Sequence, residues 1–456
     1  MEKNLTFENR LRERLHFPFS VRISHSIMGE TVSLSDTGLS LALEDPLIST
    51  RSVLIELFLP FSTPVLSAYA EVVWRKNEKK AGRFYYGFRF LRLTKQEQNV
   101  INEIFDGVRE LDENFSKFTR DFRVYLSALK KEFDFFDSNN LGETERVQYV
   151  ESRKVEIFNN FNSHFDNIWN IAKHFNKNEY QIHKKYYQGM LGFLLVDLVE
   201  INRFVNKKPL GYAGDFMLIN YHYDFHNCYL GESSFEKLIN FYTTNIEIAK
   251  SVVARKDFFK DKILGLINSK SNCRILSVGS GGARELLEIL EEDGIKNKIY
   301  FDCLDFEKEA ITFVNKKLAN VDKLKRNNLN LNFIHSDLLD LLRDVRIEKL
   351  LKKYDFIYSS GLFDYLKDRI STKIVGNLFK HLHQEGELII TNADSSSMNK
   401  RIYYEMLGEW ELIHRTKEEM FDWTKDIRDF ANIEFIDLVP KNSFLFLSIK
   451  KLKTIM

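Results

Sequence analysis

A glycine-rich turn joins an apolar run to an amphipathic one in the segment ILSVGSGGARELLEIL. Gly279 and Gly281 allow the backbone to turn tightly and to come close to a ligand, and the N-terminus of the following helix offers free N–H groups. The next apolar run ends in Asp305, whose carboxylate can accept hydrogen bonds from ribose hydroxyls. These residues predict a site for a nucleoside-containing cofactor.

Two classes of cofactor fit this pattern, the nicotinamide dinucleotides and S-adenosylmethionine (SAM). The dinucleotide fingerprint needs a third glycine where this chain has Arg284, so a close approach to a pyrophosphate is not provided for. A further acidic residue, Asp337, follows the third apolar run. The whole array resembles the class I SAM-dependent methyltransferases, in which an aspartate at that place commonly contacts the adenine amino group. The alternative is a structural α/β domain with an empty crevice.

The resemblance implies SAM as the cofactor and a set of residues that contact it. These residues follow the ends of the first four strands of the predicted sheet: Gly279, Ser280, Gly281, Gly282, Asp305, Phe306, Asp337, Leu338 and Ser359.

Several linked motifs narrow the resemblance to one bacterial methyltransferase family. They are KPLGYAGDF, VGSGGARE, SSGLFDYLKDR, TNADSSS and WELIHRT, and together they cover roughly residues 205–456. The family includes enzymes assigned to the synthesis of 3-hydroxypalmitic acid methyl ester, an extracellular signal. The resemblance therefore implies methylation of the carboxylate of a small, hydroxy-fatty-acid-like acceptor.

The chemistry of such a reaction asks little of the protein beyond positioning. A carboxylate is already ionised near neutral pH, so neither a strong base nor a metal is required. Holding the attacking oxygen in line with the methyl group can supply about 7–11 kcal/mol of the barrier. We predict that Tyr212 and Tyr365 orient the acceptor, and that Asp215 and Asp364 orient the tyrosines or face the sulfonium. The alternative for these residues is an ordinary turn at GYAGD and a helix cap at Asp364.

One further pattern has the spacing of metal ligands. His222 and His226 lie four residues apart, with Asp224 and Cys228 nearby. No third ligand follows at a telling distance and no glutamate stands beside the first histidine, so we predict no metal site.

A different ligand site is indicated near the N-terminus. The segment RLRER places Arg10 and Arg14 in an R-x-x-x-R pattern, and SLSDTG follows it. Two arginines can fork onto phosphate oxygens or a guanine edge and stack on the base. These elements resemble those of the PilZ domain, a bacterial receptor for cyclic di-GMP. The resemblance implies that cyclic di-GMP contacts Arg10, Arg14, Ser33, Ser35 and Gly38, although Ser33 replaces the family's acidic or amide residue.

The elements that position these residues follow from hydrophobic periodicity. Six alternating runs between about residues 18 and 95 predict a small antiparallel β-barrel, closed by a helix over 95–111. Aromatic residues then recur at helical spacing, which indicates a helix-bundle core, with a third helical stretch over about 179–204. Apolar strands alternating with helices follow, ending in a pair of strands near FIDLVP and FLFLSIKK, and they indicate a mostly parallel sheet.

We therefore predict a multidomain chain with a PilZ-like β-barrel over residues 1–112 and a helical linker over 113–205. Residues 206–456 form a Rossmann-like α/β methyltransferase domain with a mostly parallel seven-stranded sheet. The 66 basic and 65 acidic residues give a net charge of +1, which argues against binding a nucleic acid polymer. Three scattered cysteines and the lack of a long apolar run predict a soluble cytoplasmic protein without a membrane span.

Two functions from different classes fit these observations. The first is a methyltransferase that is regulated by cyclic di-GMP. The second is a cyclic di-GMP-responsive effector whose methyltransferase-like domain binds SAM or a partner protein without turnover. Methylation of a protein is a third possibility, and the sequence does not show the groove it would need.

Overall fold

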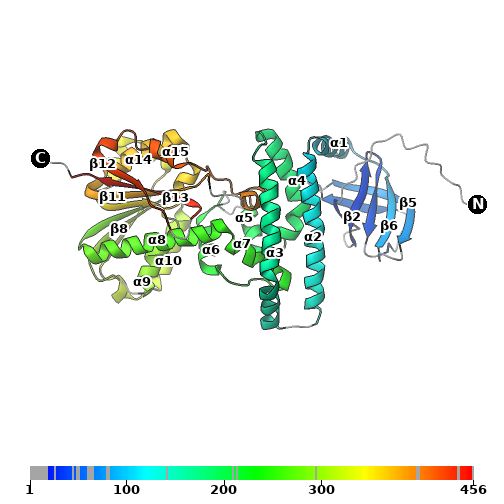
Figure 1. Cartoon of the computed structure of the whole chain (residues 1–456), viewed down its shortest axis with the longest axis horizontal. Coiled ribbons are helices and arrows are strands. Elements are labelled where there is room, and N and C mark those ends of the chain that lie inside the picture. The colour runs from blue at the N-terminus through cyan, green and yellow to red at the C-terminus, as the bar shows by residue number, and fades with distance from the viewer. Residues whose placement is uncertain are drawn as a thin grey trace, which may run out of the picture. The chain divides into compact units, whose positions relative to one another are not determined.

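A computed structural model describes most of the chain as two compact units. The described residues are 19–24, 27–43, 46–47, 52–58, 66–78, 83–139, 142–207, 210–211, 214–292, 295–396, 401–438 and 442–453. Unit 1 comprises Met1–Phe136 and Asn159–Leu198, and unit 2 comprises Asp137–Phe158 and Val199–Met456. Each unit is described by itself below (Figure 1).

Unit 1 begins with a closed antiparallel barrel, as the alternating runs predict. Its strands follow the order β1-β2-β3-β6-β5-β4. Their inward side chains, such as Val21, Leu41 and Ile55, are fully buried and form the barrel core. The strands are β1 (Ser20–Ile23), β2 (Ile27–Ser35), β3 (Gly38–Leu43), β4 (Val53–Phe58), β5 (Leu66–Glu78) and β6 (Arg83–Phe90).

The turn between β2 and β3 depends on a glycine. Ser35 pairs with Gly38 across a two-residue turn, and Gly38 also pairs with Arg89 of β6. A Cβ at position 38 would collide with the main-chain oxygen of Phe88. The close approach of β6 to this turn therefore requires glycine there.

The helices of unit 1 bury the predicted aromatic stripes. They are α1 (Lys95–Arg109), α2 (Glu113–Asp137), α4 (Lys177–Leu195) and the second half of α3 (Glu143–Ala172). Phe122 stacks on His164 with ring centroids 3.8 Å apart, and Phe161 meets Phe122 edge-on. Burial lowers the pKa of His164 to about 3, so this histidine is a neutral part of the core.

The third helical stretch is divided in the structure rather than continuous. The main-chain N–H groups of Val196 and Asp197 both donate to the Gly192 oxygen, at 2.7 and 3.0 Å, and α4 ends at Leu195. The helix α5 (Glu200–Lys207) begins after this break and belongs to unit 2. Periodicity predicts one helical stretch over about 179–204 and does not show the interruption that divides it into α4 and α5.

Unit 2 is built on a seven-stranded sheet of order β12-β13-β11-β10-β7-β8-β9. Five neighbouring strands, from β11 to the edge strand β9, are parallel, and β13 runs antiparallel to both β11 and β12. The strands are β7 (Cys273–Val278), β8 (Ile299–Asp305), β9 (Leu329–His335), β10 (Tyr354–Ser359), β11 (Leu382–Ala393), β12 (Ala431–Phe435) and β13 (Phe444–Lys451). This architecture confirms the predicted fold class.

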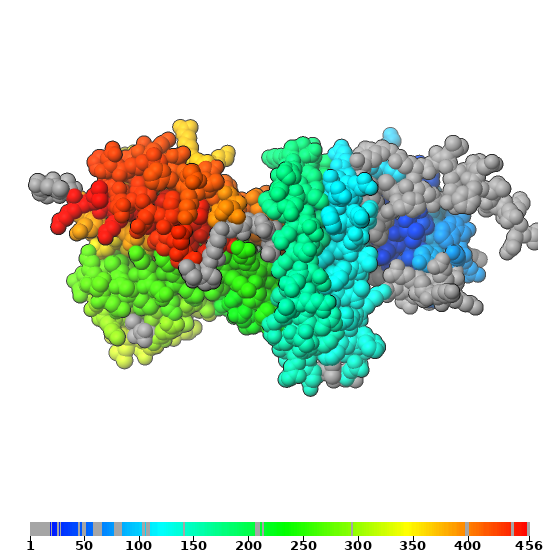
Figure 2. Space-filling view, in the orientation of Figure 1, coloured from blue at the N-terminus to red at the C-terminus, as the bar shows by residue number. Residues whose placement is uncertain are grey.

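Helices cover both faces of this sheet. In Figure 1, α8, α9 and α10 lie on one side and α14 and α15 on the other. Figure 2 shows the orange and red C-terminal residues lying against the green segment that contains α8. The helices of unit 2 that follow α5 are α6 (Phe216–Phe225), α7 (Ser234–Asn245), α8 (Glu247–Ser269), α9 (Arg284–Glu292), α10 (Lys308–Ala319), α11 (Lys323–Arg326), α12 (Leu338–Leu342), α13 (Asp344–Leu350), α14 (Asp368–Lys380) and α15 (Lys417–Asp422), with shorter turns at Leu362–Tyr365, Tyr403–Leu407 and Arg428–Phe430.

The edge strand β12 lies earlier in the chain than the FIDLVP run suggests. It ends at Phe435, where that run begins. An edge strand needs only an alternating pattern with one face half-buried, and Ala431–Phe435 has that pattern. Within the described residues, no helix combines the length and the apolar character needed to cross a bilayer.

Candidate functional site

The glycine-rich turn lies at the carboxyl end of β7, in a conformation that few other residues adopt. Gly279 and Gly281 have φ values of +67° and +50°. The N–H groups of Gly279 and Ser280 both donate to the Leu304 oxygen, so the turn is fixed to the end of β8. The N–H of Gly281 donates to Asp305 Oδ2 at 2.7 Å.

Asp305 fixes this turn through its hydrogen bond to Gly281. Its Oδ1 accepts the N–H of Glu307 at 2.9 Å, and its side chain is buried at the end of β8. Burial raises the pKa of Asp305, while the hydrogen bonds from Glu307 and Gly281 oppose that shift. Each carboxylate oxygen keeps a lone pair, which suits the acceptance of hydroxyl hydrogens.

The helix α6 covers the glycine turn. A Cβ added to Gly281 would lie 3.2 Å from Phe216 Cβ, and one added to Gly282 would lie 2.7 Å from Asn220 Nδ2. Asn220 is buried, and its Nδ2 finds no hydrogen-bond partner in the described part of the chain. Arg284, which stands where dinucleotide-binding folds have glycine, pairs with Asp224 of α6 at 2.7 Å and ties α6 to α9.

The remaining predicted cofactor residues surround the same edge of the sheet. Phe306 follows β8 and is 47% exposed. Asp337 is exposed after β9, and its Oδ1 accepts the Asp340 N–H at 3.0 Å as the cap of α12, which Leu338 begins. Ser359 is buried and donates to the Val278 oxygen at 2.9 Å, which joins the ends of β10 and β7.

These residues fit a nucleoside cofactor. The turn leaves no room for side chains at Gly281 and Gly282, Asp305 offers acceptors, and an exposed ring and carboxylate follow β8 and β9. Ligands of open α/β sheets bind at the carboxyl ends of the strands, which is where these groups lie.

Of the predicted acceptor-side residues, Tyr212 lies outside the described residues. Asp215 forms the N-cap of α6, because its Oδ1 accepts the N–H groups of Met217 and Leu218 at 3.0 Å each. This is the capping role that the sequence left open as an alternative. Its Oδ2 is buried and has no hydrogen bond to any described residue, and burial raises the pKa of this carboxyl.

Asp364 and Tyr365 lie after β10 and meet the segment that contains Asp215. Asp364 Oδ1 accepts the Ala393 N–H at 2.6 Å, and burial raises the pKa of Asp364 to about 6 against the opposing effect of Arg255. The Tyr365 hydroxyl accepts from Trp410 Nε1 at 2.8 Å, and a Cβ on Gly214 would collide with both groups. The structure thus brings three of the four predicted residues together.

The sequence analysis gave no role to three residues of this region, Arg255, Trp410 and Arg415, although the last two lie in the motif WELIHRT. Arg415 donates to the oxygens of Phe363 and Leu366 and so holds the loop that carries Asp364 and Tyr365. The sequence signal for Arg255 is its place on α8, where Ile248, Val252, Phe259 and Ile263 mark a buried stripe that includes position 255. An arginine on such a stripe is a candidate for a specific role.

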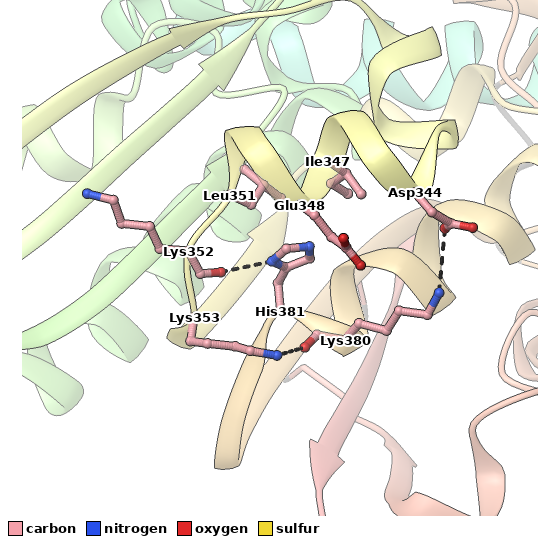
Figure 3. A pocket seen from close by; sticks show the side chains of 8 residues that line it. All are labelled: Asp344, Ile347, Glu348, Leu351, Lys352, Lys353, Lys380 and His381. Carbon is pink, nitrogen blue, oxygen red and sulfur yellow. Dashed lines mark hydrogen bonds and ion pairs between the residues drawn. The ribbon is translucent and has the colours of Figure 1, made fainter.

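The described residues of unit 2 line at least two cavities. One of about 510 Å³ borders the site and is lined by side chains of α5, α6 and α10, among them Phe204, Phe216, Asn220 and Phe313. The other, of about 340 Å³, lies at the opposite, amino end of β10 (Figure 3). There Lys353 donates to the Lys380 oxygen, and the Asp344 carboxylate pairs with Lys380. The second cavity is thus remote from the cofactor residues, and these lysines are already engaged.

The predicted cyclic di-GMP residues are only partly described. Arg10 and Arg14 lie outside the described residues. Ser33 is buried with its hydroxyl 2.7 Å from that of Ser40, and Ser35 donates to the Gly38 oxygen at 2.9 Å. Both serines therefore have partners within the barrel.

Two known domain families match parts of the chain. Residues 8–107 match the PilZ domain family, and residues 269–436 match a methyltransferase domain family. The chain therefore contains a PilZ domain followed by a methyltransferase domain with a Rossmann-like fold.

Similar proteins cover parts of the chain at low identity. A curated leucine-rich repeat and coiled-coil domain-containing protein of Plasmodium falciparum is 26% identical over 184 residues, which are 35% of this chain and 17% of that protein. The chain thus matches less than a fifth of that relative's length.

Three solved structures share 11–16% sequence identity with the chain. A possible exported protein from Bordetella parapertussis has a TM-score of 0.44 at 16% identity and covers 56% of this chain and 87% of its own. Magnesium protoporphyrin IX methyltransferase from Synechocystis PCC 6803, with bound S-adenosylhomocysteine, has a TM-score of 0.32 at 13% identity. The match covers 45% of this chain and 85% of that protein. The N-methyltransferase NodS from Bradyrhizobium japonicum WM9 has a TM-score of 0.30 at 11% identity. The match covers 44% of this chain and 98% of that protein.

Proposed function

We propose that this chain, in which a PilZ domain precedes a methyltransferase domain, transfers the methyl group of SAM to the carboxylate of a small, lipid-like acid. The observation that carries the proposal is the meeting of two groups at one edge of the sheet of unit 2. The glycine turn and Asp305 form the first group, and Asp215, Asp364 and Tyr365 form the second.

SAM is the cofactor, and when bound it supplies an electrophilic methyl group on a sulfonium. Asp305 accepts hydrogen bonds from the ribose hydroxyls, and the turn at Gly279–Gly282 allows the backbone to approach the cofactor. Phe306, Asp337 and Leu338, which follow β8 and β9, would then contact the adenine. Ser359 keeps the end of β10 against the turn through its bond to the Val278 oxygen.

The acceptor side is polar and nearly free of exposed charge. The Tyr365 hydroxyl, whose pKa is raised by burial, stays protonated and can donate to the acceptor. Tyr212 joins it on the strength of the family resemblance. Asp215 Oδ2 and Asp364 are buried carboxyls that offer negative charge toward a sulfonium, and Asp364 with a pKa of about 6 is mostly ionised at neutral pH.

The apolar part of the acceptor has a place beside the helix that covers the glycine turn. The cavity of about 510 Å³ shares Phe216 and Asn220 with the cover of the glycine turn, and aromatic side chains line it. A volume of this size is typical of small-molecule sites. The lining also holds charged residues (Asp224, Lys308, Glu309 and Lys316), and its aromatic part suits the hydrocarbon chain of an acid.

The direct test is to incubate the full chain with methyl-labelled SAM and a lysate of the producing cell. We expect label in the organic-soluble fraction, released as methanol by mild alkali, as an ester requires. The Asp305→Ala variant is the control for transfer by other enzymes in the lysate. Label on protein would contradict the small-acid acceptor. No label in any fraction, with SAM binding confirmed separately, would favour the second function, an effector that binds SAM without turnover.

We also propose that cyclic di-GMP regulates the chain through the PilZ domain, with Arg10 and Arg14 forking onto the nucleotide near Ser33, Ser35 and Gly38. Replacing Arg10 and Arg14 together by alanine should weaken binding of cyclic di-GMP by at least about a hundredfold, because two charge-assisted forks are lost. Calorimetric titration of the full chain measures this change. Arg22→Ala is the matched control, since Arg22 already pairs with Glu56 at 2.7 Å. Equal affinities of the wild type and the double variant would defeat the sensor proposal.

A further inference from the structure

Arg255 of α8 is a buried arginine that uses little of its hydrogen-bonding capacity. Its side chain is 4% exposed, yet neither Nε nor Nη1 forms a hydrogen bond with any described residue. Its ion pair with Asp364 spans 3.7 Å from Nη1 to Oδ2, which is too long for a hydrogen bond. Burying a cation without hydrogen bonds is strongly unfavourable.

Other buried cations of unit 2 show how unusual this is. Arg415 donates to two main-chain oxygens, to Asn392 Oδ1 at 2.7 Å and to Asp368 at 2.7 Å. Lys256, the next residue of α8, donates to both carboxylate oxygens of Glu288, at 2.6 and 2.7 Å. Among the described residues, Arg255 has no comparable set of acceptors, although it could donate five N–H bonds.

The surroundings place the guanidinium at the carboxyl edge of the sheet. Its Cζ lies 4.1 Å from the ring centroid of Phe444, the residue that begins β13. A Cβ added to Gly361, just after β10, would lie 3.2 Å from Arg255 Nη2, and Gly361 has a φ of +109°. A side chain at position 361 would therefore crowd the guanidinium from the side of the loop that carries Asp364.

We propose that Arg255 binds the carboxylate of a ligand at the ends of β10 and β11. A carboxylate matches the planar fork of a guanidinium and supplies the acceptors that Nε and Nη1 lack. A phosphate dianion suits the place less well, because Asp364 is a neighbour and its carboxylate would repel a doubly charged group. The ligand carboxylate thus supplies hydrogen-bond acceptors that the described residues do not offer to Nε and Nη1.

Two ligands of the proposed function carry such a group, and the inference rests on that function. One is the α-carboxylate of SAM, and the other is the carboxylate of the acceptor acid. In the second case Arg255 would hold one oxygen while the other faces the methyl group. Both cases have the same chemistry, and binding measurements separate them.

The experiment compares the wild type with Arg255→Gln by calorimetry, with no turnover required. The first arm titrates SAM and decarboxylated SAM. The second titrates 3-hydroxydecanoate and its amide in the presence of S-adenosylhomocysteine. If the cofactor carboxylate binds Arg255, the variant should lose about tenfold or more in affinity for SAM and none for decarboxylated SAM. If the acceptor carboxylate binds there, the same loss should appear for the acid and not for the amide.

Two further variants test whether the loss of affinity is specific to the guanidinium of Arg255. Arg255→Lys retains the charge without the fork and should recover part of the lost affinity. Lys256→Gln removes a buried cation from the same helix, beside Glu288 rather than at the sheet edge, and should leave all four affinities unchanged. Thermal unfolding of each variant checks that it is folded.

The outcomes also separate this inference from the proposed function. Wild-type affinity of Arg255→Gln for all four ligands would overturn the inference, and so would an equal loss for ligands with and without a carboxylate. A loss confined to SAM would uphold it even if no label reaches an organic-soluble product, because that arm does not depend on methyl transfer.

Discussion

Replacing Asp305 by asparagine is expected to lower the affinity for SAM by about a hundredfold. Both carboxylate oxygens of Asp305 accept main-chain N–H groups, from Gly281 at 2.7 Å and from Glu307 at 2.9 Å. An asparagine has one oxygen, so its NH2 group must face one of these donors. The lost charge-assisted bond and the repulsion between donors together cost roughly 3 kcal/mol, which corresponds to a hundredfold in affinity.

The substitution at Asp305 should disturb the glycine turn in addition to removing a contact with the ribose. Gly281 has a φ of +50°, and the Asp305 carboxylate fixes the N–H that points into the turn. An asparagine at position 305 can keep only one of these two main-chain hydrogen bonds. Either Gly281 or Glu307 then loses the bond that fixes its position. Affinity for the whole cofactor should therefore fall, rather than affinity for the ribose alone.

Asp302→Asn is the matched control on the same strand. Asp302 is also buried, but it accepts a hydrogen bond from the Tyr354 hydroxyl at 2.6 Å, which an asparagine oxygen can accept as well. Calorimetric titration of SAM into both variants measures the difference. If Asp305→Asn binds SAM as tightly as Asp302→Asn does, the proposed cofactor site is wrong, whatever the activity of either variant.

Features that are set by residues close together in the sequence could be predicted from it. The turn at Gly279–Gly282 and the acidic residue Asp305 stand next to apolar strands, so their place at the carboxyl ends of β7 and β8 could be predicted. The barrel and the order of elements in unit 2 follow from alternation and helical periodicity in the same way. The methyl acceptor and the role of cyclic di-GMP stay predictions, since they rest on resemblance.

Features that arise from packing between distant segments could not be predicted. The pairing of Arg255 with Asp364, and its approach to Gly361, join α8 to the loop after β10, more than a hundred residues later. The cover of the glycine turn by Phe216 and Asn220 is of the same kind. The break between α4 and α5 depends on where two N–H groups find the Gly192 oxygen, which apolar periodicity does not encode.

Replacing Arg415 by lysine should destabilise the methyltransferase domain by about 2–4 kcal/mol. The guanidinium donates to the Phe363 oxygen at 3.0 Å, to the Leu366 oxygen, to Asn392 Oδ1 and to Asp368, all from a side chain that is 2% exposed. A lysine ammonium is a point charge with three donors and cannot reach four acceptors spread around a planar fork. Buried oxygens are then left without hydrogen bonds.

The same change should reduce methyl transfer more than it reduces SAM binding. Phe363 and Leu366 flank Asp364 and Tyr365, so a loosened loop misplaces the acceptor-side residues, while the turn at Gly279–Gly282 keeps its own bonds to Leu304 and Asp305. Small displacements of positioning groups lower the rate steeply because most of the catalysis proposed here is positioning.

Chemical unfolding of the full chain measures the stability part, read on the transition that S-adenosylhomocysteine shifts, since that transition belongs to the methyltransferase domain. Arg428→Lys is the control, because Arg428 is a more exposed arginine that stacks on Phe421 with its Cζ 4.1 Å from the ring centroid. It should change the free energy of unfolding by less than about 1 kcal/mol. An Arg415→Lys variant that unfolds like the wild type would show that this arginine does not hold the loop, and the position of Asp364 and Tyr365 would then need another cause.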